Sequence, residues 1–272
     1  MNRSGMNHGM NHRCGWALIK RSWASWLQYR SFFFVIAFGW MIPPLIYLFV
    51  WSTASEPAPI AGLTPPQFVA YYLVLILVNQ LTLAQTNWTV GDVIRMGSLN
   101  SWLLKPMSPL YHAIASEVAG KIVMMVFVVP VSIVLAIVLR PELNATLRQV
   151  VLFFVALSGA WLLRFFWGLG LACLAFWATR ADALLALQDA LIFLLAGVVA
   201  PVALLPGALQ SIARVLPFYY MVGFPVEVLT GQINSTDVLT GFIIQAAWLI
   251  VAVLIYRAVW RSGLKRYSAI GG

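Results

Sequence analysis

Six long apolar stretches, separated by short polar connections, dominate the hydrophobicity pattern of this chain. They cover residues 32–51, 68–90, 118–139, 150–178, 183–205 and 238–260. A helix needs about 20 apolar residues to cross the hydrocarbon core of a bilayer, and all six stretches reach that length. Each stretch is continuously apolar, whereas the strands of a membrane barrel alternate in polarity over about ten residues. The pattern therefore predicts an all-α polytopic membrane protein with six transmembrane helices.

Composition supports this prediction. Hydrophobic residues make up 62% of the chain and charged residues 9%, with a mean hydropathy of +0.88. Soluble domains carry roughly 25% charged residues. The 17 basic residues exceed the 8 acidic ones. They form no basic cluster with interleaved stacking residues, so we attribute the excess to topology and to the lipid bilayer as a partner, and expect no nucleic acid.

The distribution of Lys and Arg predicts the orientation of the chain. With a cytoplasmic N-terminus, twelve basic residues fall on the cytoplasmic side and only Arg140, Arg148 and Arg214 on the other. Short cytoplasmic loops retain basic residues, so both termini are expected in the cytoplasm. This topology separates Cys14 from Cys173, and we expect no structural disulfide.

Four regions follow from the same pattern. Residues 1–13 repeat Met-Asn-His and are expected to be a disordered tail, which explains His8 and His12 better than a metal site does. Residues 14–31 carry Trp and Leu at helical spacing beside Lys and Arg, which predicts an interfacial elbow helix that either moves with the bundle or anchors it. Residues 32–262 form the transmembrane domain, and residues 263–272 a cytoplasmic tail.

The connection at 91–117 is too apolar for a solvated loop. Leu99, Trp102 and Leu103 lie at positions i, i+3 and i+4, which predicts a short helix with an apolar face between Arg95 and Lys105. Such a face suits a cytosolic protein partner. An interfacial helix packed on lipid explains the periodicity equally well.

The connection after the fifth stretch contains apolar runs that are too short to span. We expect re-entrant helices at 207–215 and 224–231 that form an outer gate, with a loop lying on the membrane surface as the alternative. Glu227 is the one acid in the apolar part of this connection, which makes it a candidate for substrate contact or helix capping. The candidate gate residues are Pro217, Phe218, Tyr219, Pro225 and Glu227.

Polar residues follow one side of the second stretch, within an arc of about 120° at 100° per residue. They either line a translocation path or bind a neighbouring helix at a dimer seam, since hydroxyl and amide side chains also join helices. Both roles are compatible in a transporter whose path runs along that seam. The residues are Asn79, Thr82, Gln85, Thr86 and Thr89.

Charges also occur inside later stretches. Arg164 lies near the middle of the fourth stretch and Asp189 about two turns into the fifth, so each is costly when it faces lipid alone. We expect them to pair, either as a hinge-like ion pair or as a static packing contact. Lys121 follows Glu117 by four residues, and we expect it to snorkel to the interface.

Three segments resemble the permease subunits of ABC type-2 exporters. They are Arg-Met-Gly-Ser-Leu-Asn-Ser-Trp-Leu-Leu-Lys-Pro-Met-Ser-Pro-Leu-Tyr at 95–111, Leu-Pro-Phe-Tyr-Tyr-Met-Val-Gly-Phe-Pro-Val-Glu-Val-Leu-Thr-Gly at 216–231, and Gly-Leu-Lys-Arg-Tyr-Ser-Ala-Ile-Gly-Gly at 263–272. The resemblance runs from about Trp16 onward. It implies re-entrant helices after the fifth span and a coupling helix that docks on an ATPase subunit. That helix comprises Arg95, Met96, Gly97, Ser98, Leu99, Trp102 and Leu103.

The resemblance also implies the division of labour. The chain has no Gly-x-x-x-x-Gly-Lys-Ser/Thr phosphate loop, so ATP and Mg are expected on separate ABC ATPase subunits, with no cofactor on this chain. A second permease chain, identical or related, would complete an exporter of hydrophobic or amphipathic molecules in the bacterial cytoplasmic (inner) membrane. An ATP-independent carrier or channel is the alternative. An enzyme is disfavoured, because no converging nucleophile and base or metal motif is present.

Overall fold

Long helices account for most of the computed structural model, which describes residues 30–105, 108–178 and 182–267. No β-strand occurs within those ranges, and the predicted all-α class is confirmed. The helices are α2 (Arg30–Ala54), α3 (Pro65–Thr82), α4 (Thr86–Arg95), α5 (Asn100–Leu103), α6 (Pro109–Leu139), α7 (Leu147–Ala172), η1 (Cys173–Phe176), α8 (Asp182–Leu195), η2 (Val202–Leu204), α9 (Gly207–Val215), α10 (Pro217–Met221), α11 (Gly223–Thr230) and α12 (Ser235–Leu264).

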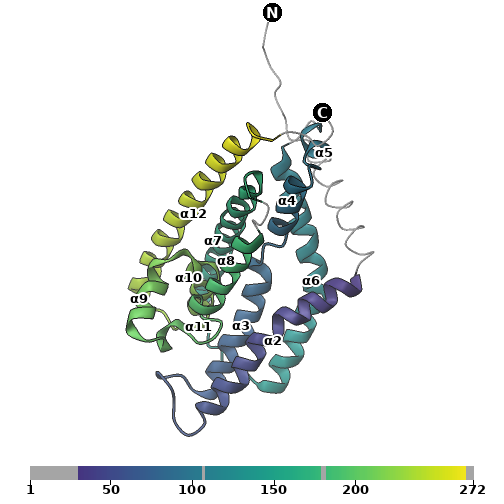
Figure 1. Cartoon of the computed structure of the whole chain (residues 1–272). Coiled ribbons are helices and arrows are strands. Elements are labelled where there is room, and N and C mark those ends of the chain that lie inside the picture. Colours follow the sequence, from purple (N-terminus) through teal and green to yellow (C-terminus); the bar gives the residue numbers. More distant parts are fainter. Residues whose placement is uncertain (1–29, 106–107, 179–181, 268–272) are drawn as a thin grey trace, which may run out of the picture.

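The long helices lie side by side in one elongated bundle (Figure 1). Short α5 and the C-terminal end of α12 lie at one end, which we call the α5 end, and the α2–α3 connection lies at the opposite end. Among the described residues, five helical segments are long and apolar enough to cross a membrane. These segments are Phe34–Ala54, Pro65–Arg95, Pro109–Leu139, Leu147–Phe176 and Thr236–Leu264.

Local sequence signals start several of these helices. Thr64 and Gln67 form a capping box before α3, and Thr146 and Gln149 form another before α7. Each box satisfies backbone N–H groups that the first turn of a helix leaves without partners. At α6, the Ser108 hydroxyl accepts a hydrogen bond from the Leu110 N–H. The helix starts are therefore encoded locally by the sequence.

The second apolar stretch is interrupted. Helix α3 ends at Thr82 and α4 begins at Thr86, so residues 83–85 form a break within the segment that spans the bundle. Leu83 has φ −54° and ψ 124°, an extended conformation that turns the chain out of the α-helix. The continuous second span expected from the sequence is thus two helices.

The fifth apolar stretch also differs from the expected span at 183–205. Helix α8 ends at Leu195 after 14 residues, fewer than the roughly 20 that a full crossing needs. Gly197 adopts φ +85°, a conformation that L side chains rarely adopt, and Pro201 lacks an N–H to continue a helix. The chain then passes through η2 and α9–α11 rather than emerging as a single straight helix.

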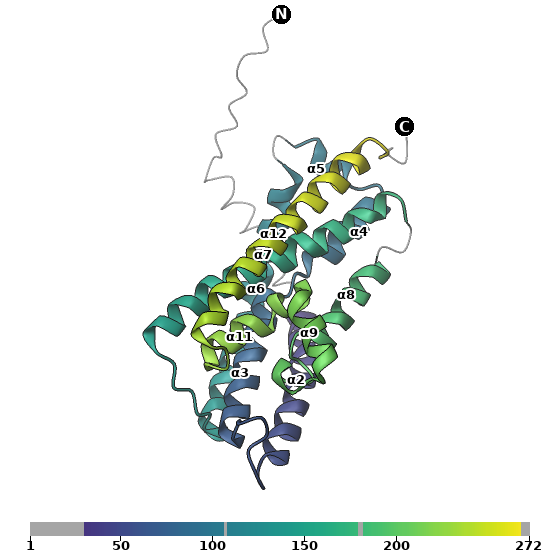
Figure 2. The same ribbon diagram turned by 90° about the vertical axis from the view of Figure 1, so that its left-hand side faces the viewer.

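Helix α7 lies at the centre of the bundle and packs along α12, as both views show (Figures 1 and 2). It also contacts α3, α4 and α11. Large apolar side chains on α2, α6 and α12 are exposed, among them Val35, Val126 and Leu254. Exposed apolar surface of this extent on spanning helices fits contact with lipid. The expected tail at 1–13 and most of the elbow helix at 14–31 lie outside the described residues.

Candidate functional site

The α4–α5 segment at the α5 end is held in place by buried and stacked side chains. Leu99 is fully buried, in a cluster with Val90 and Ile94 of α4. Trp102 of α5 stacks on His112 of α6 with ring centroids 5.4 Å apart. Gly97 adopts φ +71° and lets the chain turn between the two helices. The segment is therefore an ordered projection of the bundle and not a loose loop.

An apolar surface remains exposed on this segment. The exposed fractions are 66% for Met96, 39% for Leu103 and 86% for Leu104. We call these three residues the apolar tip. Beside the tip, Arg95 forms an ion pair of 2.6 Å with Asp92. The expectation that Leu99 offers its side chain to a partner is wrong, because neighbouring residues cover it completely. Leu104, at the end of the same segment, is the most exposed of the three tip residues.

Tyr267, which follows the C-terminal end of α12, contacts the same segment. The Tyr267 hydroxyl donates to the Gly97 carbonyl, and the Tyr267 ring lies edge-on to Phe176 of η1. Phe176 in turn lies edge-on to Trp260 of α12. The hydrophobicity pattern did not predict this link, because a single Tyr near the C-terminus belongs to no periodic pattern. It joins the α4–α5 segment to the two central helices, α7 and α12.

A lysine holds the break in the second span. The Lys121 ammonium of α6 donates to the Leu83 carbonyl and pairs with Glu117 at 2.8 Å. A backbone carbonyl freed from a helix at this depth needs a donor from within the protein. The expectation that Lys121 snorkels toward the interface is wrong, because its ammonium turns inward to the break.

Arg164 of α7 lies beside the last turn of α3, next to the break, and is 1% exposed. One terminal nitrogen donates to Asn79 Oδ1 at 2.8 Å and to Thr82 Oγ1 at 3.2 Å. The other lies 3.6 Å from Asp189 Oδ1 of α8. The expected ion pair is therefore present, and it also includes the last turn of α3.

The polar stripe of the second span has two parts. Asn79 and Thr82 are buried and face Arg164 within this one chain. Gln85 is half-buried and Thr89 exposed, while the side chain of Thr86 lies outside the described residues. The inner part thus performs the helix-joining role, and a place on a translocation path stays a prediction for the rest.

Several buried polar atoms around the break lack hydrogen-bond partners among the described residues. They are both amide atoms of Asn87, the Gln188 Oε1 and the Arg164 Nε. Asn87 packs directly on Gly168 of α7, where an added Cβ would lie 2.1 Å from its amide nitrogen. Buried polar atoms without partners destabilise a fold, and the hydrogen bonding around the break is less complete than in a typical protein core.

The second interruption, after α8, is held by uncharged donors. The Tyr71 hydroxyl donates to the Gly197 carbonyl at 3.0 Å, and the Tyr72 hydroxyl to the Val199 carbonyl at 3.1 Å. Trp51 Nε1 also donates to Val199, at 2.8 Å. Sequence reasoning missed these residues, since aromatic side chains in an apolar stretch are most often plain core.

The candidate gate residues lie inside the bundle. Helices α9 and α11 match the expected short helices, and α10 lies between them. The Tyr219 hydroxyl donates to Glu227 Oε2 at 2.5 Å, and α11, which does not span the bundle, packs on α7 and α3. Burial raises the pKa of the Glu227 carboxyl to about 7. All five candidate gate residues are buried: Pro217, Phe218, Tyr219, Pro225 and Glu227.

This arrangement defines a multi-pass α-helical membrane protein with two interrupted segments and an exposed apolar tip at one end. Its described residues contain no group of three or more His, Cys, Asp or Glu that could hold a metal ion. The model of the ABC-2 family transporter protein family matches residues 41–271. The chain therefore belongs to the ABC-2 transporter family and is a transport permease. None of the curated proteins or solved structures compared with the chain matches it.

Proposed function

We propose that this permease is the transmembrane subunit of an ATP-driven exporter for a hydrophobic or amphipathic molecule. The observation that supports the proposal most is the apolar tip, because Met96, Leu103 and Leu104 are exposed on an ordered segment where the resemblance to ABC type-2 permeases implies a helix that docks on an ATPase. Exposed apolar side chains on a rigid base are typical of protein-interface anchors. The ATPase binds ATP and Mg, and this chain needs no cofactor.

The proposed assembly has two ABC ATPase subunits and a second permease chain, identical or related. The α5 end faces the cytoplasm of a bacterial cell, both termini are cytoplasmic, and the bundle lies in the inner membrane, in accordance with the distribution of Lys and Arg. In this orientation the re-entrant helices α9–α11 lie away from the ATPase, where they form the proposed outer gate.

The proposed mechanism begins at the apolar tip. Closure of the ATPase pair pushes on the tip, and buried Leu99 together with the Tyr267–Gly97 hydrogen bond passes the movement to α4 and α12. Helix α4 then turns against α3 at residues 83–85, where the backbone is already out of the helix. The two permeases change how they meet, and the substrate leaves toward the outer face.

The docking step is tested by affinity purification of the tagged permease from its own host in mild detergent, followed by mass spectrometry. The wild-type protein should bring along a cytosolic protein with a phosphate-loop motif. The double variant Met96→Asp/Leu104→Asp should lose that protein at least tenfold, because two charges then face an apolar site on the partner. The matched control is Leu147→Asp, which charges a side chain of 80% exposure at the opposite end.

Two results would contradict the proposal. Retention of the ATPase by the double variant would remove the apolar tip from the interface. Wild-type protein that purifies without any ATPase, even after crosslinking in cells, would favour an ATP-independent carrier or channel.

A further inference from the structure

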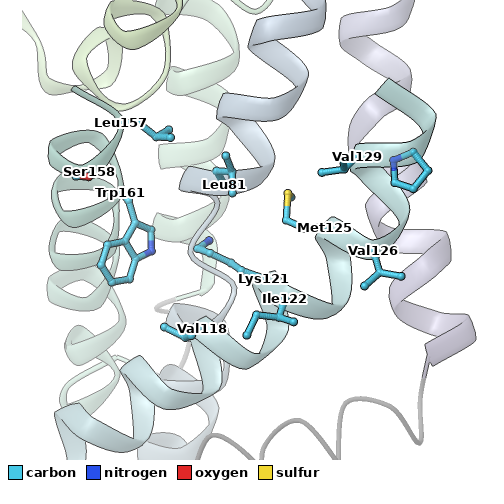
Figure 3. A pocket seen from close by; sticks show the side chains of 11 residues that line it. Leu81, Val118, Lys121, Ile122, Met125, Val126, Val129, Leu157, Ser158 and Trp161 are labelled. Atoms are coloured by element: carbon cyan, nitrogen blue, oxygen red, sulfur yellow. The ribbon is translucent and has the colours of Figure 1, made fainter. Parts of the chain in front are cut away.

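A groove opens on the side of the bundle between α6 and α7, close to the break in the second span (Figure 3). Its volume is about 760 Å³, and Leu81 of α3 forms part of its floor. The α6 wall is apolar and open to the side, with Ile122 46% and Val126 62% exposed. From Lys121 to Pro130 this wall is about 13 Å long at 1.5 Å per residue. None of the candidate site residues predicted from the sequence lines this groove.

Two polar donors converge on the end of the groove away from Pro130. Figure 3 shows the nitrogen edge of Trp161 on α7 turned toward Lys121 on α6. Trp161 Nε1 is buried and has no hydrogen-bond partner among the described residues. An ammonium group has three donors, and in Lys121 the Leu83 carbonyl and Glu117 take two of them. The groove therefore combines an apolar wall with donors that call for an acceptor oxygen.

We propose that this groove binds one phospholipid molecule of the surrounding bilayer. One acyl chain lies along Ile122, Val126 and Val129, and the Trp161 ring turns its buried N–H into the groove, where an ester or phosphate oxygen accepts from Nε1–H with Lys121 beside it. An indole N–H without a hydrogen-bond partner in apolar surroundings destabilises the protein, and an acceptor oxygen removes that cost. The positive charge of Lys121 complements a phosphate, and the site is independent of whether the permease is ATP-driven.

A phospholipid explains the groove better than a second copy of the permease does. The groove opens toward the lipid-facing side of α6, where Ile133, Val134 and Ile137 continue the exposed apolar surface. A protein partner would have to bring both a long apolar wedge and an acceptor at hydrocarbon depth. Every phospholipid carries both, in this order along its length. A bound lipid would also lie against the Lys121 contact that holds the break.

The test is photo-crosslinking in nanodiscs of phosphatidylethanolamine and phosphatidylglycerol that contain a phospholipid with a diazirine in its acyl chain. Mass spectrometry should find the strongest labelling at Ile122, Val126 and Val129, above the annular background at Ile250 and Leu254 of α12. Trp161→Phe keeps an aromatic ring but removes the N–H, and should lower groove labelling about three- to tenfold. The matched control is Trp248→Phe, whose N–H already donates to the Val215 carbonyl and which should leave labelling unchanged.

Ser158→Phe provides a second variant, because it narrows the groove without removing a donor. It should lower labelling even if Trp161→Phe proves poorly folded. The proposal would be overturned if labelling in the groove equals the α12 background and is the same in the wild type and in both variants. Efficient disulfide crosslinking of Val126→Cys between two permease copies in the bilayer would also overturn it, because a second chain would then cover the groove.

Discussion

Two interruptions of the apolar helices are held by different chemistry. At residues 83–85 the second span is broken beside two cations, Lys121 and Arg164, with Asp189 and Glu117 as their counter-charges. At residues 196–201 the chain after α8 is held by Tyr71, Tyr72 and Trp51, which are neutral donors. At each interruption, side-chain donors satisfy backbone carbonyls where water is scarce: Lys121 at the first, and the aromatic residues at the second.

The two interruptions also differ in how completely their buried polar atoms are hydrogen-bonded. The aromatic donors sit on α2 and α3 and pin the carbonyls of Gly197 and Val199 at distances of 2.8 to 3.1 Å. Around residues 83–85, Asn87, Gln188 and the Arg164 Nε have buried atoms without partners in the described structure, whereas near the second interruption Glu227 contributes one such atom, its Oε1. Incomplete hydrogen bonding lowers the cost of an alternative arrangement, which supports the proposed movement at the break of the second span.

Loss of Arg164 should have the largest effect on this comparison. Arg164→Ala leaves Asp189 without its cation and Asn79 without its donor, at a cost of about 3–5 kcal/mol. Thermal unfolding in nanodiscs should show a clearly lower midpoint. The double variant Arg164→Ala/Asp189→Ala should recover part of the loss, because no charge is then stranded. A single variant as stable as the wild type would show that the ion pair holds nothing together.

Gly197→Ala should come next and act on the other interruption. The alanine would adopt a strained φ of +85°, and its Cβ would lie 2.2 Å from the Tyr71 hydroxyl oxygen. We expect a loss of about 1–3 kcal/mol, measured as the midpoint of thermal unfolding. Gly207→Ala is the matched control, since an added Cβ there meets nothing within 4 Å. Equal midpoints for the two variants would argue against a tightly pinned interruption.

Lys121→Met should have an intermediate effect. The variant keeps an unbranched apolar side chain but removes the donor to the Leu83 carbonyl and the cation beside buried Glu117, which keeps its other interactions, at about 1–3 kcal/mol. Its distinctive result is local: amide hydrogen exchange should rise at residues 83–87 and stay constant at 196–200. Faster exchange across the whole bundle would instead mean that Lys121 has a general structural role.

Tyr72→Phe should have the smallest effect. Only one hydroxyl is lost, and Trp51 Nε1 still donates to the Val199 carbonyl. About 1 kcal/mol is expected from the loss of one hydrogen bond, again from thermal unfolding. A loss as large as that of Arg164→Ala would place the more sensitive interruption after α8.

The sequence predicted the parts of this fold that depend on local composition. Prolines and short apolar runs indicated the helices after α8, and two lone charges inside apolar stretches indicated the Arg164–Asp189 pair. The break at residues 83–85 could not be predicted, because Leu-Ala-Gln contains no helix breaker and the freed carbonyl depends on Lys121 from another helix. Leu99 and Leu103 likewise share one periodicity, and only packing at the α5 end buries the first and exposes the second.

Amide hydrogen exchange of the permease in nanodiscs, with and without the proposed ATPase partner and nucleotide, tests the central claim most directly. The account predicts faster exchange at residues 83–87 than at 196–200, and a change at 83–87 alone when nucleotide closes the ATPase pair. Equal protection of both interruptions, or a nucleotide-dependent change confined to 196–200, would contradict the assignment of movement to the second span.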